Sequence, residues 1–160
     1  MPTRKHIRLQ GYNYSQEGAY FVTVCTMNRV ELFGKIDTSD VVTLKLSSYG
    51  KIVDEAILEM ADHYDSLSLD KYIVMPNHIH MILFFDEGQK MKSQRPMTAL
   101  LPTAIAALKR ITNKRAGRSL WQASYHDHII RDEKGYLTVW SYIDTNPQRW
   151  ADDEYYSAEG

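Results

Sequence analysis

The order of strand-like and helix-like segments constrains the fold of this chain more than any other feature of its sequence. Strand-like segments alternate apolar and polar side chains with a period of two, and helix-like segments repeat apolar residues three or four positions apart. Strands are predicted over 19–27, 69–75, 79–85 and 126–131, and helices over 49–60, 102–115 and 133–145. Ser47 or Ser48 can cap the first helix and Asp132 the last, and Pro102 is expected in a first turn, where proline is tolerated.

The first six of these elements follow the order strand, helix, strand, strand, helix, strand, which is the split βαβ or ferredoxin-like arrangement. We therefore expect an α+β fold in which an antiparallel sheet carries helices on one face. The last helix is expected to cover or edge the other face. With 160 residues, the chain has the length of a single domain. We also expect a polar N-terminal arm over 1–18 and a mobile polar loop over 86–97.

The longest apolar runs of the chain are short, and no apolar leader opens it. The single cysteine, Cys25, cannot form an internal disulfide and is expected to be a buried thiol in a reducing compartment. These observations predict a cytoplasmic protein without a membrane-spanning segment.

The basic side chains are concentrated in one part of a chain whose formal net charge is −1. Residues 89–118 contain eight basic residues and no acidic one. Such a block produces a local positive field, which is typical of a phosphate-binding surface, although a merely solvated basic face has the same composition. The eight residues are Lys90, Lys92, Arg95, Lys109, Arg110, Lys114, Arg115 and Arg118.

Two histidines, His78 and His80, stand at the start of the third predicted strand. Side chains two positions apart in a strand share a face, so the imidazoles project together while Ile79 points towards the helices. Two neighbouring imidazoles can chelate one divalent metal, and nitrogen donors favour Zn, Mn, Ni or Co over Mg. We expect the pair to be exposed, so that it contributes little to packing. A purely structural pair of histidines is the alternative.

A third metal ligand has to come from another segment. His126 and His128 form a second His-x-His pair, but Asp127 between them makes both faces of that segment polar. This pattern indicates an exposed edge strand, or a supporting role in which His128 orients a bound phosphate or ligand.

The last predicted helix offers a better candidate for the third ligand. Tyr142 and Asn146 lie four residues apart on one flank of its apolar stripe, so they are neighbours on one helical face. A side chain on such a flank can face a cleft. The amide oxygen of Asn146 could therefore complete a metal site with His78 and His80, beside the phenol of Tyr142.

Two motifs together resemble the HUH-type single-tyrosine transposases. The first is the Met-Pro-Asn-His-Ile-His block at 75–80, and the second is Tyr-Ile-Asp-Thr-Asn-Pro at 142–147. The insertion-sequence-200-like class is the most similar, and within it the REP-associated tyrosine transposase branch. Further matching segments lie at 7–12, 18–23, 32–34, 121–122 and 125–131. The resemblance therefore covers nearly the whole chain.

The resemblance implies a role for each matching residue. His78 and His80 match the metal ligands of the HUH motif, and Tyr142 matches the nucleophile. Asn146 takes the place of the third ligand, with Gln148 as a local rival or a supporting residue. The implied reaction is metal-dependent cleavage and rejoining of single-stranded DNA through a 5′-phosphotyrosine, with Mg or Mn as the metal in use.

The resemblance also implies the partners. Relatives recognise single strands folded into hairpins, such as REP elements, and the basic block over 89–118 would hold this DNA. Relatives work as monomers or as homodimers, and both states stay open for this chain. Two other functions also stay open: a domesticated protein that binds DNA hairpins without cleaving them, and a metal-dependent phosphodiesterase that activates water.

Overall fold

A computed structural model describes residues 18–85 and 97–152 of the chain. Its centre is a four-stranded sheet in the order β4-β5-β1-β6, with β1 at Ala19–Cys25, β4 at Leu67–Met75, β5 at His78–Phe85 and β6 at His126–Ile129. Every neighbouring pair of strands is antiparallel. Counted along the chain, the strand order is 2-3-1-4, which is the split βαβ topology. The predicted fold class is confirmed.

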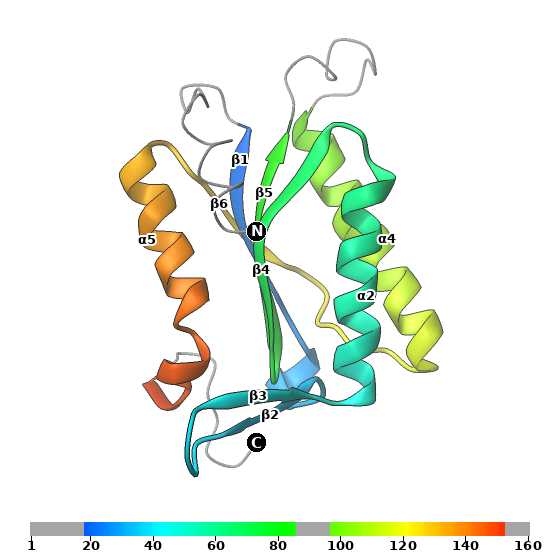
Figure 1. Ribbon diagram of the computed structural model, residues 1–160. Helices are drawn as coiled ribbons and strands as arrows, with labels where there is room; N and C mark the ends of the chain where they lie inside the picture. Colours follow the sequence, from blue (N-terminus) through cyan, green and yellow to red (C-terminus); the bar gives the residue numbers. More distant parts are fainter. Residues whose placement is uncertain (1–17, 86–96, 153–160) are drawn as a thin grey trace.

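Two helices, α2 at Ser48–His63 and α4 at Met97–Ala116, cover one face of this sheet, and α5 at Glu133–Asp144 covers the other (Figure 1). The larger apolar core lies between the sheet and the α2–α4 pair. It buries alternate residues of the strands, among them Val22, Val24, Ile79 and Met81. The smaller core lies between the sheet and α5. It contains the strand residues whose side chains point to this second face, such as Ile82 and Phe84. Because strand side chains alternate, each strand contributes to both layers.

The capping residues predicted for the first and the last helix are confirmed. The Ser47 hydroxyl accepts a hydrogen bond from the Gly50 amide at 3.1 Å, which satisfies one of the free N–H groups at the start of α2. The Asp132 carboxylate does the same for Gly135 at the start of α5, at 2.7 Å.

The start of α4 differs from the prediction. The helix begins at Met97, so Pro102 lies inside it rather than in its first turn. Leu101, which is 2% exposed, packs into the larger core directly before the proline, and this burial holds the preceding turn in place. The proline costs the helix one internal hydrogen bond, since it has no N–H. At the other end, Gly117 ends the helix with a positive φ of 73°.

A small second sheet was not predicted. Strand β2 at Gly34–Asp37 pairs with β3 at Thr43–Leu46, and short 3-10 helices lie at Met27–Arg29 (η1) and Pro147–Asp152 (η2). The hairpin continues directly into α2, where the chain passes close to itself. A Cβ added to Gly50 would lie 2.0 Å from the carbonyl oxygen of Phe33, so this position requires glycine.

Several predicted features lie outside the described residues. They are the predicted arm over 1–18 except for its last residue, the predicted loop over 86–97 except for its last residue and, with that loop, Lys90, Lys92 and Arg95. Within residues 18–85 and 97–152, no helix combines the length and the apolar composition that crossing a membrane requires.

Candidate active site

The two histidines of β5 point towards α5, as the strand pattern predicts. Ile79 between them packs in the α2–α4 core, and Ile82 and Phe84, which share the parity of the histidines, pack under α5. The imidazole rings of His78 and His80 are 4.5 Å apart between centroids, and their Nε2 atoms are 3.1 Å apart. The predicted exposure is wrong: His78 is 0% and His80 1% exposed. Strand β5 is an inner strand of the sheet, and the segment 142–150 covers this part of it.

A chain of hydrogen bonds orients the first imidazole. Asn77, in the turn between β4 and β5, donates from its amide nitrogen to the backbone carbonyl of Arg29 at 3.1 Å. Its amide oxygen accepts from Nδ1 of His78, at 2.8 Å. A neutral imidazole that carries its proton on Nδ1 presents a lone pair on Nε2. In this tautomer the Nε2 atom of His78 can act as an acceptor or as a metal ligand.

The second imidazole is held from the neighbouring strand. Nδ1 of His80 lies 2.8 Å from the hydroxyl of Thr23 on β1, the residue that pairs with it across the two strands. A hydroxyl can either donate or accept, so this contact is compatible with either tautomer of His80. Burial lowers the pKa of His80 well below its ordinary range, and the neighbouring His78 lowers it further. His80 is therefore neutral at pH 7.

The donor set fits a divalent metal. Two Nε2 lone pairs 3.1 Å apart repel each other unless a proton or a cation lies between them. Ligating histidines typically hold their second ring nitrogen in a hydrogen bond, as Asn77 and Thr23 do here. Within the described part of the chain, no third His, Cys, Asp or Glu joins the pair. A further protein ligand from these residues would therefore be of another type, such as an amide oxygen.

Tyr142 lies beside the histidine pair. Its ring centroid is 5.3 Å from that of His80 and 6.2 Å from that of Phe21, a residue on β1. The side chain is half-buried, so the ring packs against the sheet while part of it remains open to solvent. The guanidinium of Arg149 also lies near this ring, with Cζ 5.8 Å from the ring centroid.

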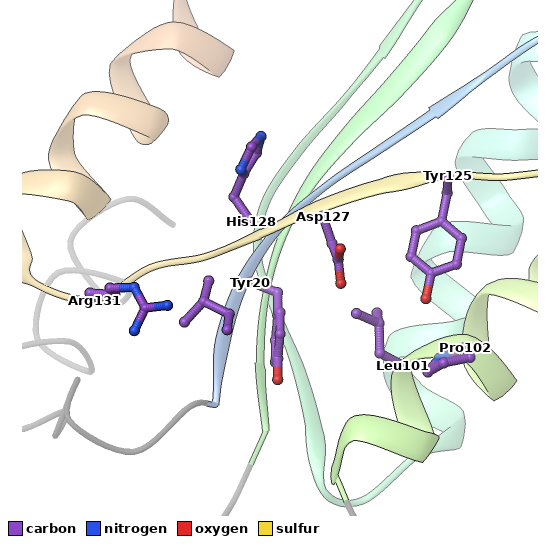
Figure 2. A pocket seen from close by; sticks show the side chains of 8 residues that line it. Tyr20, Leu101, Pro102, Tyr125, Asp127, His128 and Arg131 are labelled. Atoms are coloured by element: carbon purple, nitrogen blue, oxygen red, sulfur yellow. The ribbon is translucent and has the colours of Figure 1, made fainter.

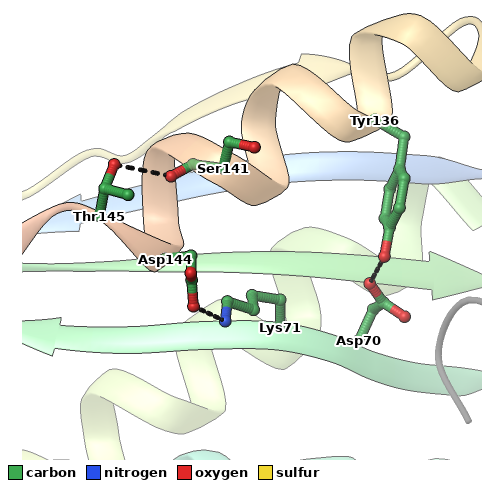
Figure 3. Close-up of polar contacts among 6 residues, drawn as sticks. All are labelled: Asp70, Lys71, Tyr136, Ser141, Asp144 and Thr145. Atoms are coloured by element: carbon green, nitrogen blue, oxygen red, sulfur yellow. Dashed lines mark hydrogen bonds and ion pairs between the residues drawn. The ribbon is translucent and has the colours of Figure 1, made fainter. Parts of the chain in front are cut away.

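Polar contacts between α5 and β4 hold the tyrosine helix on the sheet (Figure 3). The hydroxyl of Tyr136 donates to the buried carboxylate of Asp70 at 2.6 Å. Lys71 forms an ion pair with Asp144 at 2.8 Å and lies 3.9 Å from the ring centroid of Trp140. A shift in the strand pairing between Leu69 and Lys71 marks a β-bulge. The bulge explains how consecutive residues, Asp70 and Lys71, both reach α5.

Asn146 lies just beyond α5, where its backbone N–H donates to the carbonyl of Ile143 at 3.2 Å. It is 1% exposed. Tyr142, four residues before it, packs against His80. Trp150, four residues after it, stacks on His78 with 6.1 Å between ring centroids. The structure thus brings the segment that carries Tyr142 and Asn146 over the histidine pair.

Comparison with known proteins places the chain among relatives. No protein-family model matches it. It is 33% identical over 170 residues to an uncharacterised protein of Haemophilus influenzae, with 96% of this chain and 93% of that protein covered. A second protein of the same organism, assigned to the REP-associated tyrosine transposases, is 22% identical over 143 residues, with 84% of this chain and 73% of that protein covered.

Two solved structures share the fold. A REP-associated tyrosine transposase bound to a REP hairpin aligns with a TM-score of 0.61 and 23% identity, covering 84% of this chain and 69% of that one. A protein of Deinococcus radiodurans assigned as a transposase aligns with a TM-score of 0.51 and 17% identity, covering 84% and 95%. The chain belongs to the same family as the Haemophilus influenzae protein to which it is 33% identical. Its fold is that of the transposase structures. The resemblance predicted from the sequence is confirmed, and these similarities support a function of the transposase type.

In this transposase fold the second histidine pair lies on the edge strand β6. His126, Asp127 and His128 are all exposed, as their pattern predicts. His128 stacks on Phe21 with 6.3 Å between ring centroids, and Phe21 in turn contacts His80 at 5.1 Å. Figure 2 shows His128 and Asp127 on opposite sides of the strand, with Asp127 directed into a cavity on the α4 side. Gln148 is exposed on η2.

The described part of the basic block lies on α4 and just beyond it, across the sheet from Tyr142. Three of its members make contacts within the protein. The ammonium of Lys109 donates to the backbone carbonyls of residues 122, 123 and 124 at 3.0, 3.1 and 3.3 Å. Arg115 forms an ion pair with Glu59 on α2, at 2.8 Å. Arg118 donates to the carbonyl of Ser119 at 3.2 Å and lies 5.8 Å from the ring centroid of Tyr49. Arg110 and Lys114 are exposed.

The residues that orient the site were not singled out from the sequence, although some signals for them exist. Thr23 has the strand parity that faces α5, and Asn77 directly precedes His78. Either could have been inferred as a hydrogen-bond partner of an imidazole. Trp150 and Arg149 follow Pro147, where the helix prediction ends, so nothing in the local pattern places them beside the site.

Proposed function

We propose that this protein cleaves and rejoins single-stranded DNA, with Tyr142 as the nucleophile and a divalent metal held by His78, His80 and Asn146. The observation that carries the proposal is the contact of Tyr142 with His80, whose Nε2 atom faces that of His78. The similarity to REP-associated tyrosine transposases, in sequence and in fold, supports the same reading.

The proposed metal site uses the nitrogen donors that the structure brings together. Asn77 and Thr23 would fix the two rings so that both Nε2 atoms point to the same place. The bound metal would act as a Lewis acid on an oxygen of the phosphate. Mg or Mn follows from the family resemblance, while imidazole donors also suit Zn, Ni or Co.

In the proposed reaction the phenol oxygen of Tyr142 attacks phosphorus. A bond forms between this oxygen and phosphorus, and the bond from phosphorus to the 3′ oxygen of the preceding nucleotide breaks. The phenol proton passes to solvent, and the departing 3′ oxygen takes up a proton from solvent. The products are a 5′-phosphotyrosine and a free 3′-hydroxyl. Attack by another 3′-hydroxyl reverses these changes and rejoins DNA without any nucleotide cofactor.

The contacts of one chain are sufficient to bring the tyrosine to the histidines. The Tyr136–Asp70 hydrogen bond and the Lys71–Asp144 ion pair dock α5 on its own sheet. This arrangement supports cleavage by Tyr142 at the metal site of the same chain, as a monomer or in each subunit of a homodimer.

We propose hairpin-forming single-stranded DNA as the substrate, since the structural relative was solved with a REP hairpin. The exposed basic residues of α4 would hold the phosphates of the hairpin at a distance from the cleaved bond. Lys109 and Arg115 have internal partners, so Arg110 and Lys114 are the better candidates for this role.

Salt dependence tests this assignment. If about four phosphates are neutralised, the slope of log K for hairpin binding against log salt concentration should be about −3. Fluorescence anisotropy with a labelled hairpin measures it. Changing both Arg110 and Lys114 to Ala should flatten the slope by between about 1 and 2. The double variant Lys35→Ala with Lys51→Ala removes the same charge from exposed positions of β2 and α2 and should leave the slope unchanged. Equal slopes for all three proteins would place the DNA elsewhere.

One denaturing gel distinguishes the proposed function from its two alternatives. The protein is incubated with Mn²⁺ and a hairpin oligonucleotide labelled on either side of the break. DNA covalently attached to protein supports the transposase reaction. Cleaved ends without an adduct would favour a phosphodiesterase that activates water. Binding on a native gel without cleavage would favour a protein that only recognises hairpins.

A further inference from the structure

A groove along the outer side of α5 ends at Tyr142. It is lined by Glu133, Lys134, Leu137, Thr138, Ser141, Tyr142 and Arg149. The groove therefore extends along α5 from Glu133 to Tyr142 and is bordered by Arg149 of the segment that follows the helix. A chain bound in it would contact the side chain of Tyr142.

The position of Arg149 in this groove is fixed by its neighbours. Its backbone N–H donates to the carbonyl of Thr145 at 3.3 Å and to that of Asn146 at 3.2 Å. Asn146 before it and Trp150 after it are 1% and 8% exposed, so the backbone is anchored on both sides. The side chain itself is exposed and lies beside Tyr142. Because the backbone is already anchored, binding an anion would require ordering of the Arg149 side chain only.

The groove contains two cationic side chains, Lys134 and Arg149. Lys71 and Arg115 have carboxylate partners, and Lys109 has three carbonyl partners. Within residues 18–85 and 97–152, no carboxylate lies at ion-pair distance from Arg149 or Lys134. The groove contains one carboxylate, that of Glu133, against these two cations.

We propose that this groove binds the phosphodiester backbone of a DNA single strand, with Arg149 on the phosphate attacked by Tyr142 and Lys134 on a neighbouring phosphate. The inference rests on the proposed cleavage by Tyr142. A guanidinium matches the geometry of two phosphate oxygens, and it stabilises the charge that develops on them during the transfer. The hydroxyl of Ser141 adds a donor at the wall of the groove. Arg149 is thus a catalytic residue of this site.

Single-turnover cleavage of a labelled hairpin tests the role of Arg149. The variant Arg149→Gln should lower the rate at saturating protein on the order of 100-fold, since transition-state donors to transferred phosphoryl groups have effects of this size. The dissociation constant of the hairpin should change less than about threefold, because most of the phosphate contacts lie elsewhere. Arg149→Lys should recover part of the rate, since it restores the charge without the planar fork.

Two controls separate this role from general effects of charge and folding. Arg131→Gln removes the same charge from an exposed position that borders the cavity on the α4 side, and it should cleave like wild type. The melting temperature of Arg149→Gln should match that of wild type, since the side chain is exposed. If Arg149→Gln does not fold, the comparison of Arg149→Lys with wild type decides: an unchanged rate for the lysine variant overturns the requirement for a guanidinium.

The role of Lys134 is tested with methylphosphonate linkages, which replace a charged phosphate by a neutral one, at positions flanking the break. One such position should slow wild type about as much as Lys134→Gln does, and the two changes together should add nothing further. Additive effects at every position would overturn the contact. If wild type forms no covalent adduct, the proposed function fails. If wild type forms the adduct and Arg149→Gln cleaves at the same rate, only the groove is wrong.

Discussion

Tyr142→Phe is expected to reduce DNA cleavage to background, a loss of at least about 1000-fold, while folding, metal binding and hairpin binding stay intact. The substitution removes the phenol oxygen alone. The ring keeps its contacts with His80 and Phe21, so α5 should remain docked. Single-turnover cleavage of a labelled hairpin, together with anisotropy for binding, measures both halves of this prediction.

Tyr125→Phe serves as the matched control. Tyr125 is half-buried on the other side of the sheet, where it borders the cavity that contains Asp127. Losing its hydroxyl should not affect cleavage. Cleavage by Tyr142→Phe at more than a few per cent of the wild-type rate would contradict the assignment of the nucleophile.

Replacing either histidine of the pair is expected to have the second largest effect. His78→Ala and His80→Ala should each weaken binding of Mn²⁺ or Co²⁺ by at least about 100-fold and abolish cleavage, because each removes a nitrogen donor. Both side chains are buried, so truncation also leaves a cavity and should cost about 2–4 kcal/mol of stability. Calorimetric titration is therefore carried out at a temperature at which the variants remain folded.

A gentler variant separates metal binding from stability. Thr23→Val keeps the shape of the side chain and removes only its hydrogen bond to Nδ1 of His80. Because such outer partners orient ligating imidazoles, metal affinity should fall by about 10–100-fold. Wild-type affinity in both histidine variants would exclude this pair as the metal site, and wild-type affinity in Thr23→Val would show that the hydroxyl does not orient His80.

The features predicted correctly from the sequence are those that depend on local periodicity. The two-residue period of β5 predicts His78 and His80 on one face and Ile79 on the other, and helical spacing predicts Tyr136 and Ile143 on the face of α5 that packs against the sheet. These assignments need no knowledge of the neighbours. The split βαβ topology followed from the order of the elements, because few topologies accommodate that order.

The features that were missed depend on tertiary contacts. The strand pattern by itself predicts exposed histidines, because it does not contain the tertiary contact by which Trp150 covers His78. The bulge at Asp70 contains no glycine or proline from which it could be predicted. The block of basic residues looked uniform along the chain, yet Lys109 and Arg115 have partners on the loop over 122–124 and on α2. A charge count cannot distinguish these residues from exposed ones.

Mapping the covalent adduct tests the central claim most directly. Wild-type protein is incubated with Mn²⁺ and a hairpin labelled 3′ of the break, then digested with trypsin and with nuclease. Cleavage after Lys134 and Arg149 gives a peptide over 135–149 that contains two tyrosines, Tyr136 and Tyr142. Tyr136 is 1% exposed and donates its hydroxyl to Asp70, so it is not accessible to DNA. We expect fragment ions to place the nucleotide on Tyr142, whereas an adduct on any other tyrosine, or cleavage without an adduct, would contradict the assignment of Tyr142 as the nucleophile.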